Sequence, residues 1–68
     1  MDGNAWIVRF AERLGVEAPD QALIDELLAL AGDAAHASER IAAPIACYLV
    51  GSAGIDVATA RRLAAEVV

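Results

Sequence analysis

The feature that most constrains how this chain folds is an uncharged run from Ile41 to Ile55. The run contains the apolar segment 45–50 and is interrupted by one proline, Pro44, and by two glycines. A helix that spans a membrane needs about 20 consecutive apolar residues, so the run is too short for a membrane segment. Two interpretations remain. The run is either a helix buried in the core of the domain or a helix whose surface binds another chain.

The length of the chain predicts a single small domain over residues 1–68. A domain of this size buries only about 60% of the surface that its unfolded chain exposes. Much of the hydrophobic content is alanine, which favours helix but buries little area per residue. The single cysteine, Cys47, rules out an internal disulfide. We therefore expect association with another chain to contribute more to stability here than in a larger domain.

The charge of the chain excludes several classes of partner. The net charge is −5, and all five cations are arginines that form no continuous basic stripe. Such a chain repels phosphate, so we expect no binding to nucleic acid or to anionic membranes. The N-terminus lacks the positive and apolar regions of a signal peptide. A single thiol fits a reducing compartment, and the predicted location is the cytoplasm.

Hydrophobic periodicity predicts four helices and no strand. They are expected at about 4–14, 21–37, 44–50 and 57–67, with Asn4, Asp20 and Asp56 as N-caps. Pro44 favours a new helix at that point, because proline is tolerated only in a first turn. Whether the second and third helices are separate or form one kinked helix stays open at this stage.

The third predicted helix is apolar all round, which is typical of a helix covered on several sides. The predicted fold class is therefore all-α, a compact bundle of about four short helices with this apolar helix at its centre. Trp6 has two interpretations. It packs in the core, or it anchors an interface, where tryptophan is enriched.

The candidate partner-binding site is the polar cluster next to the uncharged run. Asp33, His36 and Arg40 share one helical face if the second helix continues by one more turn. The full predicted set is Asp33, His36, Glu39, Arg40 and Tyr48. The competing interpretation is a solvated surface cluster that helps to end the helix.

No pattern in the sequence predicts catalysis, a metal or a cofactor. His36, Glu39 and Cys47 do not match a zinc-ligand spacing. Cys47 lies in the most apolar segment, where a cysteine behaves as a small hydrophobic residue. The run 50–54 lacks the lysine of a phosphate-binding loop. We expect a protein that is not an enzyme and binds no cofactor; an enzyme or redox protein that uses Cys47 is the least favoured hypothesis.

The segment Leu27–Gly54 resembles a small actinobacterial domain family of unknown function. The most specific matches are Asp33, Ala35-His36, Glu39-Arg40 and Ala42-Ala43-Pro44, and Trp6 and Leu14-Gly15 also fit. Domains of this kind occur alone or fused to a nucleotidyltransferase that builds the guanylylated molybdenum cofactor, and some occur near formate dehydrogenase genes. No catalytic residues are established for the family, so the resemblance assigns none here.

The resemblance implies an accessory role in molybdenum cofactor supply or in a molybdoenzyme complex. The first hypothesis is a non-catalytic interaction protein whose partner is a molybdoenzyme subunit, such as one of formate dehydrogenase, or a cofactor-biosynthesis protein. The second is a self-associating structural domain, a homodimer without a dedicated partner. A mass that depends on protein concentration favours the second.

Overall fold

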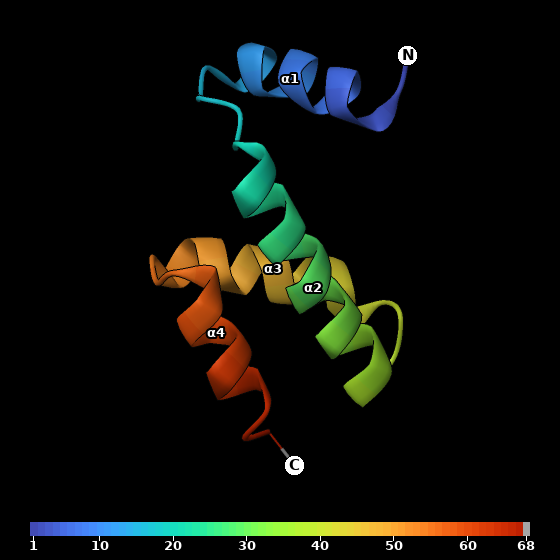
Figure 1. The fold of residues 1–68 in the computed structure, drawn as a ribbon, viewed down its shortest axis with the longest axis vertical. Helices are drawn as coiled ribbons and strands as arrows, with labels where there is room; N and C mark the ends of the chain where they lie inside the picture. Colours follow the sequence, from blue (N-terminus) through green and yellow to red (C-terminus); the bar gives the residue numbers. More distant parts are fainter. Residues whose placement is uncertain (68) are drawn as a thin grey trace.

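A computed structural model describes residues 1–67, which form four α-helices and contain no strand (Figure 1). The helices are α1 (Gly3–Leu14), α2 (Gln21–Ala37), α3 (Ala42–Ala53) and α4 (Val57–Ala64). The all-α class with four short helices is confirmed. The bounds of α2 agree with the prediction, whereas α3 is longer than predicted at both ends and α4 ends before the predicted Val67.

Aspartate side chains start three of the four helices. Asp2, Asp20 and Asp56 each accept a hydrogen bond from the backbone N–H three residues further on, at 2.8, 2.9 and 3.0 Å. These bonds satisfy donors that have no partner within the helix. Asp20 and Asp56 are confirmed as N-caps. The prediction of Asn4 is wrong, because Asp2 takes the capping position and Asn4 lies inside α1.

The second and third helices are separate. α2 ends at Ala37, and Ser38 leaves the helical conformation with φ −137° and ψ −103°. Pro44 lies in the first turn of α3, where its missing N–H removes no helical hydrogen bond. α3 runs past Gly51 and ends at Gly54, which has the left-handed φ of 71° and donates its N–H to the Val50 carbonyl at 3.1 Å.

α2 is the central helix of the fold. It packs on α3 and on α4, and no other pair of helices packs to a comparable extent. Leu30 of α2 is 1% exposed and is the one large side chain in the described part of the chain that is fully buried. The other buried apolar residues are Ala11, Val57 and Ala60. The core is therefore small and lies where α2 meets its neighbours.

The prediction that the apolar helix is the central one is wrong. α3 contains no buried residue, and its apolar side chains divide into two faces. The half-buried face consists of Ala42, Ala43, Ala46, Cys47 and Val50, and the exposed face of Pro44, Ile45, Tyr48 and Leu49. Both sets repeat at helical spacing. The first face packs on α2, and neither α1 nor α4 packs on α3 to a comparable extent, so the second face stays exposed.

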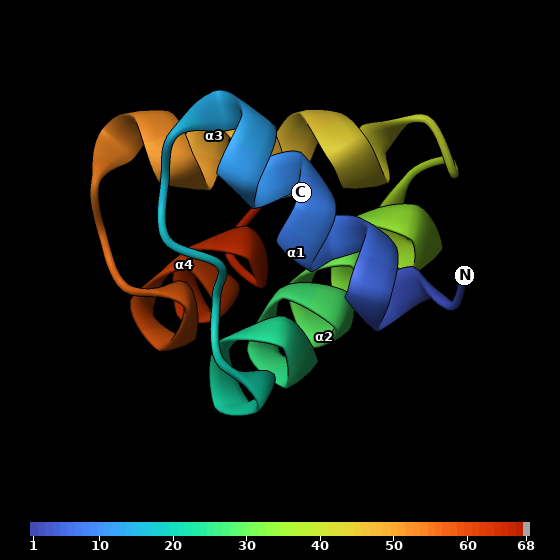
Figure 2. The ribbon, with the colours of Figure 1, turned by 90° about the horizontal axis from the view of Figure 1, so that it is seen from above.

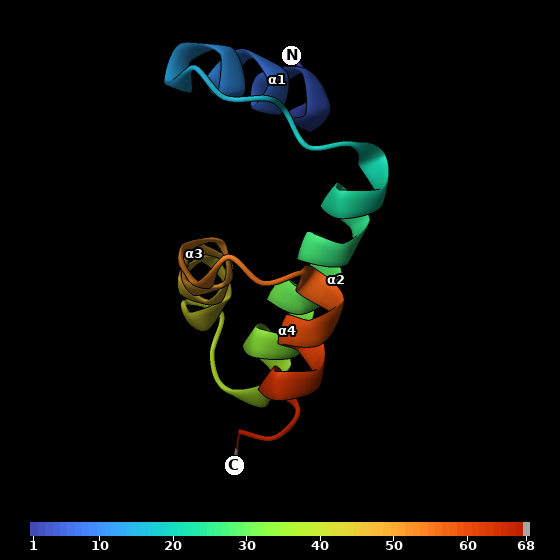
Figure 3. The ribbon, with the colours of Figure 1, turned by 90° about the vertical axis from the view of Figure 1, so that its left-hand side faces the viewer.

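α1 lies across one end of α2 (Figures 1 and 2), and it is separated from α3 and α4 along the long axis of the molecule (Figures 1 and 3). Its apolar side chains stay largely uncovered, and Ala11 is its one buried residue. Trp6 is 56% exposed, so it does not pack in the core. Its ring stacks on Phe10 with the ring centroids 5.0 Å apart. Of the two interpretations of Trp6, the interface anchor is the one that fits this exposure.

Candidate functional site

A hollow of about 980 Å³ lies between the end of α2, the first half of α3, and α4. Its lining is mostly alanine from all three helices: Ala34, Ala37, Ala42, Ala46, Ala58 and Ala64. The methyl side chain of alanine is too short to fill the space between helices, so the space stays open. Polar groups of Asp33, His36, Ser38, Arg61 and Arg62 also line it. The hollow thus combines an apolar floor with charged groups.

An ion pair joins α2 to α4 at this hollow. Arg61 donates from Nε to one carboxylate oxygen of Asp33 at 2.7 Å and from Nη2 to the other at 3.3 Å. This two-point geometry is the strongest form of a guanidinium–carboxylate pair. The hydrogen bond from Arg61 lowers the pKa of Asp33, and the same bond raises the pKa of Arg61. The pair is exposed to solvent, so its contribution to stability is modest.

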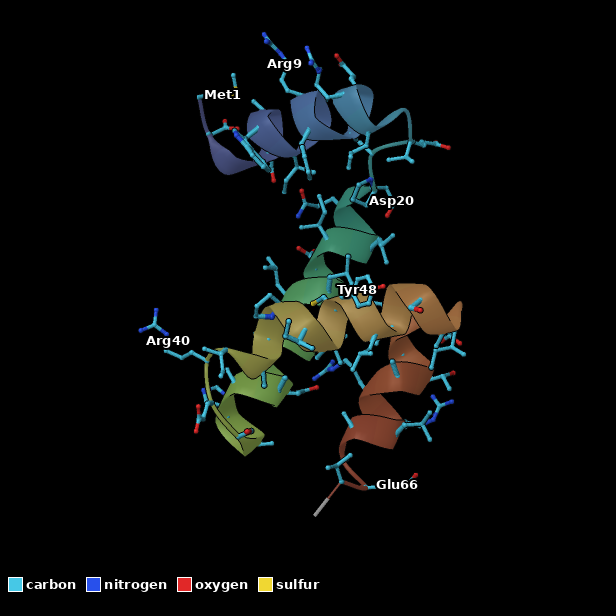
Figure 4. The ribbon with its side chains drawn as sticks, turned by 180° about the vertical axis from the view of Figure 1, so that it is seen from behind. Met1, Arg9, Asp20, Arg40, Tyr48 and Glu66 are labelled. Atoms are coloured by element: carbon cyan, nitrogen blue, oxygen red, sulfur yellow. The ribbon has the colours of Figure 1, made fainter. Side chains whose placement is uncertain are left out.

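The structure brings together only part of the predicted partner-binding set. Asp33 and His36 both line the hollow. Arg40 extends away from the helices at the edge of the molecule (Figure 4). It does not join the face of His36, because α2 ends at Ala37 and helical spacing no longer applies. Glu39 and Tyr48 do not line the hollow, and Tyr48 lies on the exposed face of α3.

Sequence reasoning missed Arg61 and Arg62 as parts of this site. Both side chains are exposed on α4. The pairing of Arg61 with Asp33 spans 28 residues of sequence, and no local pattern reports a contact of that separation. Arg62 donates to the Thr59 hydroxyl at 3.1 Å, which holds its side chain along α4.

Residues 1–67 contain no group of three or more His, Cys, Asp or Glu side chains that could hold a metal ion. The Cys47 thiol is half-buried and lies 4.0 Å from the Leu27 carbonyl oxygen, as a weak donor. Within the same residues, no helix has both the length and the apolar character required to cross a membrane.

We expect the Asp33–Arg61 pair to make stability depend on pH in acid. The folded state lowers the pKa of Asp33 below 3.8, so the pair stabilises the fold above that pH and stops doing so as pH falls through the folded pKa. Asp33→Asn should therefore lower the thermal unfolding midpoint at neutral pH and flatten its decline in acid. The control is Asp25→Asn on the same helix, whose side chain bonds only the neutral Gln21. Equal acid profiles for Asp33→Asn and the unmodified chain would contradict this assignment.

A family model described as "Domain of unknown function (DUF6457)" matches residues 1–68 of the chain. Comparison with curated proteins and with solved structures finds no match.

Proposed function

Since the chain belongs to that family, whose description specifies no function, we propose from its surfaces that it is a non-catalytic domain that docks on a partner protein. The observation that carries the proposal is the alanine-lined hollow with charged groups at its border. Small residues allow the backbone of another helix or a single large apolar anchor to approach closely. A hollow of this kind suits recognition of a protein segment.

The charges around the hollow indicate what the docked segment carries. The lining residues Arg61, Arg62 and Asp33 carry two positive charges and one negative charge, although the chain as a whole has a net charge of −5. Arg62 also interacts with the charge of Asp56 at the start of α4, which does not line the hollow. A carboxylate on the partner would pair with Arg62, since the Arg61 guanidinium already binds Asp33. The segment that fits best has an apolar anchor next to an acidic residue.

The partner that we propose is a molybdoenzyme subunit or a protein of molybdenum cofactor biosynthesis. The resemblance of Leu27–Gly54 to actinobacterial domains found alone or fused to the cofactor guanylyltransferase supports this choice. Fusion holds two domains together at a high effective concentration. A domain that is not fused to its partner would achieve the same association by direct binding, which is the role proposed for the hollow. The proposed location is the cytoplasm, where such a partner would be met.

The test is affinity purification of the tagged chain from its own host, with mass spectrometry of the proteins that copurify. Enrichment of a molybdenum-related protein is the expected result. Arg62→Glu should reduce that recovery about tenfold, because it places a negative charge where the partner's carboxylate binds. Arg9→Glu makes the same charge change on α1 and should leave recovery unchanged, since Arg9 points away from the rest of the molecule (Figure 4).

Two outcomes would contradict the proposal. Recovery of the tagged chain alone would contradict the hypothesis of a dedicated partner. Equal recovery by Arg62→Glu and Arg9→Glu, with both variants helical by circular dichroism, would remove the hollow as the docking site.

A further inference from the structure

The chain has a larger accessible surface area than is expected for a compact monomer of its mass. Its accessible surface is 5318 Å². A folded monomer of 7.0 kDa is expected to expose about 4,000 Å² from the scaling of surface with mass. The radius of gyration, 12.5 Å, is likewise above the roughly 11 Å expected for a domain of this length. About 1,300 Å² of surface is therefore left uncovered that a monomer of this size would bury.

Two apolar faces contribute to this surface. One is the stripe of α1 that carries Trp6, Phe10 and Leu14, and the other is the exposed face of α3 with Ile45, Tyr48 and Leu49. All six side chains are close to half exposed or more. α1 and α3 extend to the same side of α2 but are separated along it (Figure 3). They do not pack on each other, so neither covers the other.

We propose that a second copy of this chain covers both faces in a symmetric homodimer. The uncovered area of two copies adds to about 2,600 Å², which is within the range of roughly 2,000–5,000 Å² that obligate homodimers bury. In a dimer with two-fold symmetry the same patch is used on both chains. A contact of this size would bring the surface of each chain down to that expected for a folded domain of its mass.

The distribution of charge is compatible with self-association at these faces. Two copies that each carry −5 repel one another unless they meet where charge is absent. α3 contains no charged residue. On α1, Glu12 lies off the apolar stripe and Arg9 projects away from the rest of the molecule (Figure 4). Arg13 lies beside Trp6, seven residues along the helix, and its positive charge does not repel an acidic chain. The faces left uncovered are thus those that a second acidic chain can approach without opposing like charges.

The dimer goes beyond the docking role, because it uses different residues. None of the six apolar side chains lines the hollow next to Arg61. The hollow includes Ala42 and Ala46 of α3, which lie on the half-buried face of that helix. Tyr48 projects from the exposed face, and Leu49 lies at the border of the two faces, seven residues after Ala42. Each chain of the dimer would therefore keep its hollow available to a partner.

The test is the mass of the purified chain by sedimentation equilibrium over a range of concentrations. We expect about twice the chain mass of 7.0 kDa for the unmodified chain and for Arg9→Glu. Phe10→Glu and Leu49→Glu should each shift the mass to that of one chain, because they bury a charge in the interface. Phe10→Glu and Arg9→Glu place the same residue at adjacent positions of α1, on different faces.

Further measurements keep the test decisive if the variants unfold. The thermal midpoint of the unmodified chain should rise with protein concentration, as it does for a dimer whose unfolding is coupled to dissociation. A single-chain mass with a concentration-independent midpoint would overturn the dimer. A single-chain mass together with loss of partner recovery in Leu49→Glu would also overturn it and assign the face to the partner. Arg62→Glu should keep the dimer mass, which separates failure of the dimer from failure of the docking site.

Discussion

Replacing Leu30 by alanine is expected to unfold most of the chain at room temperature. Leu30 is the one large side chain of the described residues that is fully buried, and it lies on the central helix α2. A buried leucine-to-alanine change costs about 2–5 kcal/mol through lost burial and the cavity that remains. A core in a chain of this length rarely supplies more than about 3–5 kcal/mol in total. One substitution therefore removes most of the stability.

The control for this prediction lies two positions earlier on the same helix. Leu28 is 66% exposed, so Leu28→Ala should change the free energy of unfolding by no more than about 0.5 kcal/mol. Urea unfolding followed by far-ultraviolet circular dichroism compares the two variants under the same conditions. If Leu28→Ala destabilised the chain as much as Leu30→Ala, the face of α2 assigned to the core would be wrong.

Two glycines, one inside α3 and one at its C-cap, should respond in opposite directions to the same substitution. Gly54 has a φ of 71°, and the left-handed conformation costs an L-residue about 1–2 kcal/mol. Gly54→Ala should therefore destabilise the chain by about that amount, since it strains the turn that leads into α4. Gly51 is inside the helix, and a Cβ added there meets nothing within 4 Å. Gly51→Ala should stabilise the chain by about 0.8–1 kcal/mol.

The difference between the free energies of unfolding of these two variants, about 2–3 kcal/mol, is large for so small a domain. Thermal unfolding of both alanine variants beside the unmodified chain measures it directly. Stabilisation by Gly54→Ala would show that α3 does not end there and that α4 is reached by another path. The pair thus tests the end of α3 separately from any question of packing.

Much of the secondary structure could be predicted because its signals are local. Asp20 and Asp56 cap the helices that follow them, and each bond reaches only three residues along the chain. Pro44 and Gly54 limit α3 through their own backbone preferences. The local nature of these signals also explains why the N-cap of α1 was placed wrongly. Asp2 and Asn4 are equally good capping residues, and the sequence offers no local reason to choose between them.

The candidate site was only half predictable. Asp33 and His36 share a face of α2 by helical spacing alone, and both line the hollow. The partner of Asp33 is Arg61, which comes from α4 and depends on how α2 and α4 cross. The predicted position of Arg40 is wrong for a different reason. Its predicted place beside His36 assumed one more turn of helix, and the chain turns away after Ala37.

The sequence by itself determined where helices form and which positions on each helix are apolar. The capping bonds, the proline and the glycines act within a few residues, so they need no tertiary contact. Only the tertiary structure decided which of those apolar positions are covered. α3 is apolar all round, yet α2 covers one face of it and leaves Tyr48 71% exposed. Burial requires a second surface as well as an apolar side chain, and four short helices supply too few surfaces to cover every apolar face.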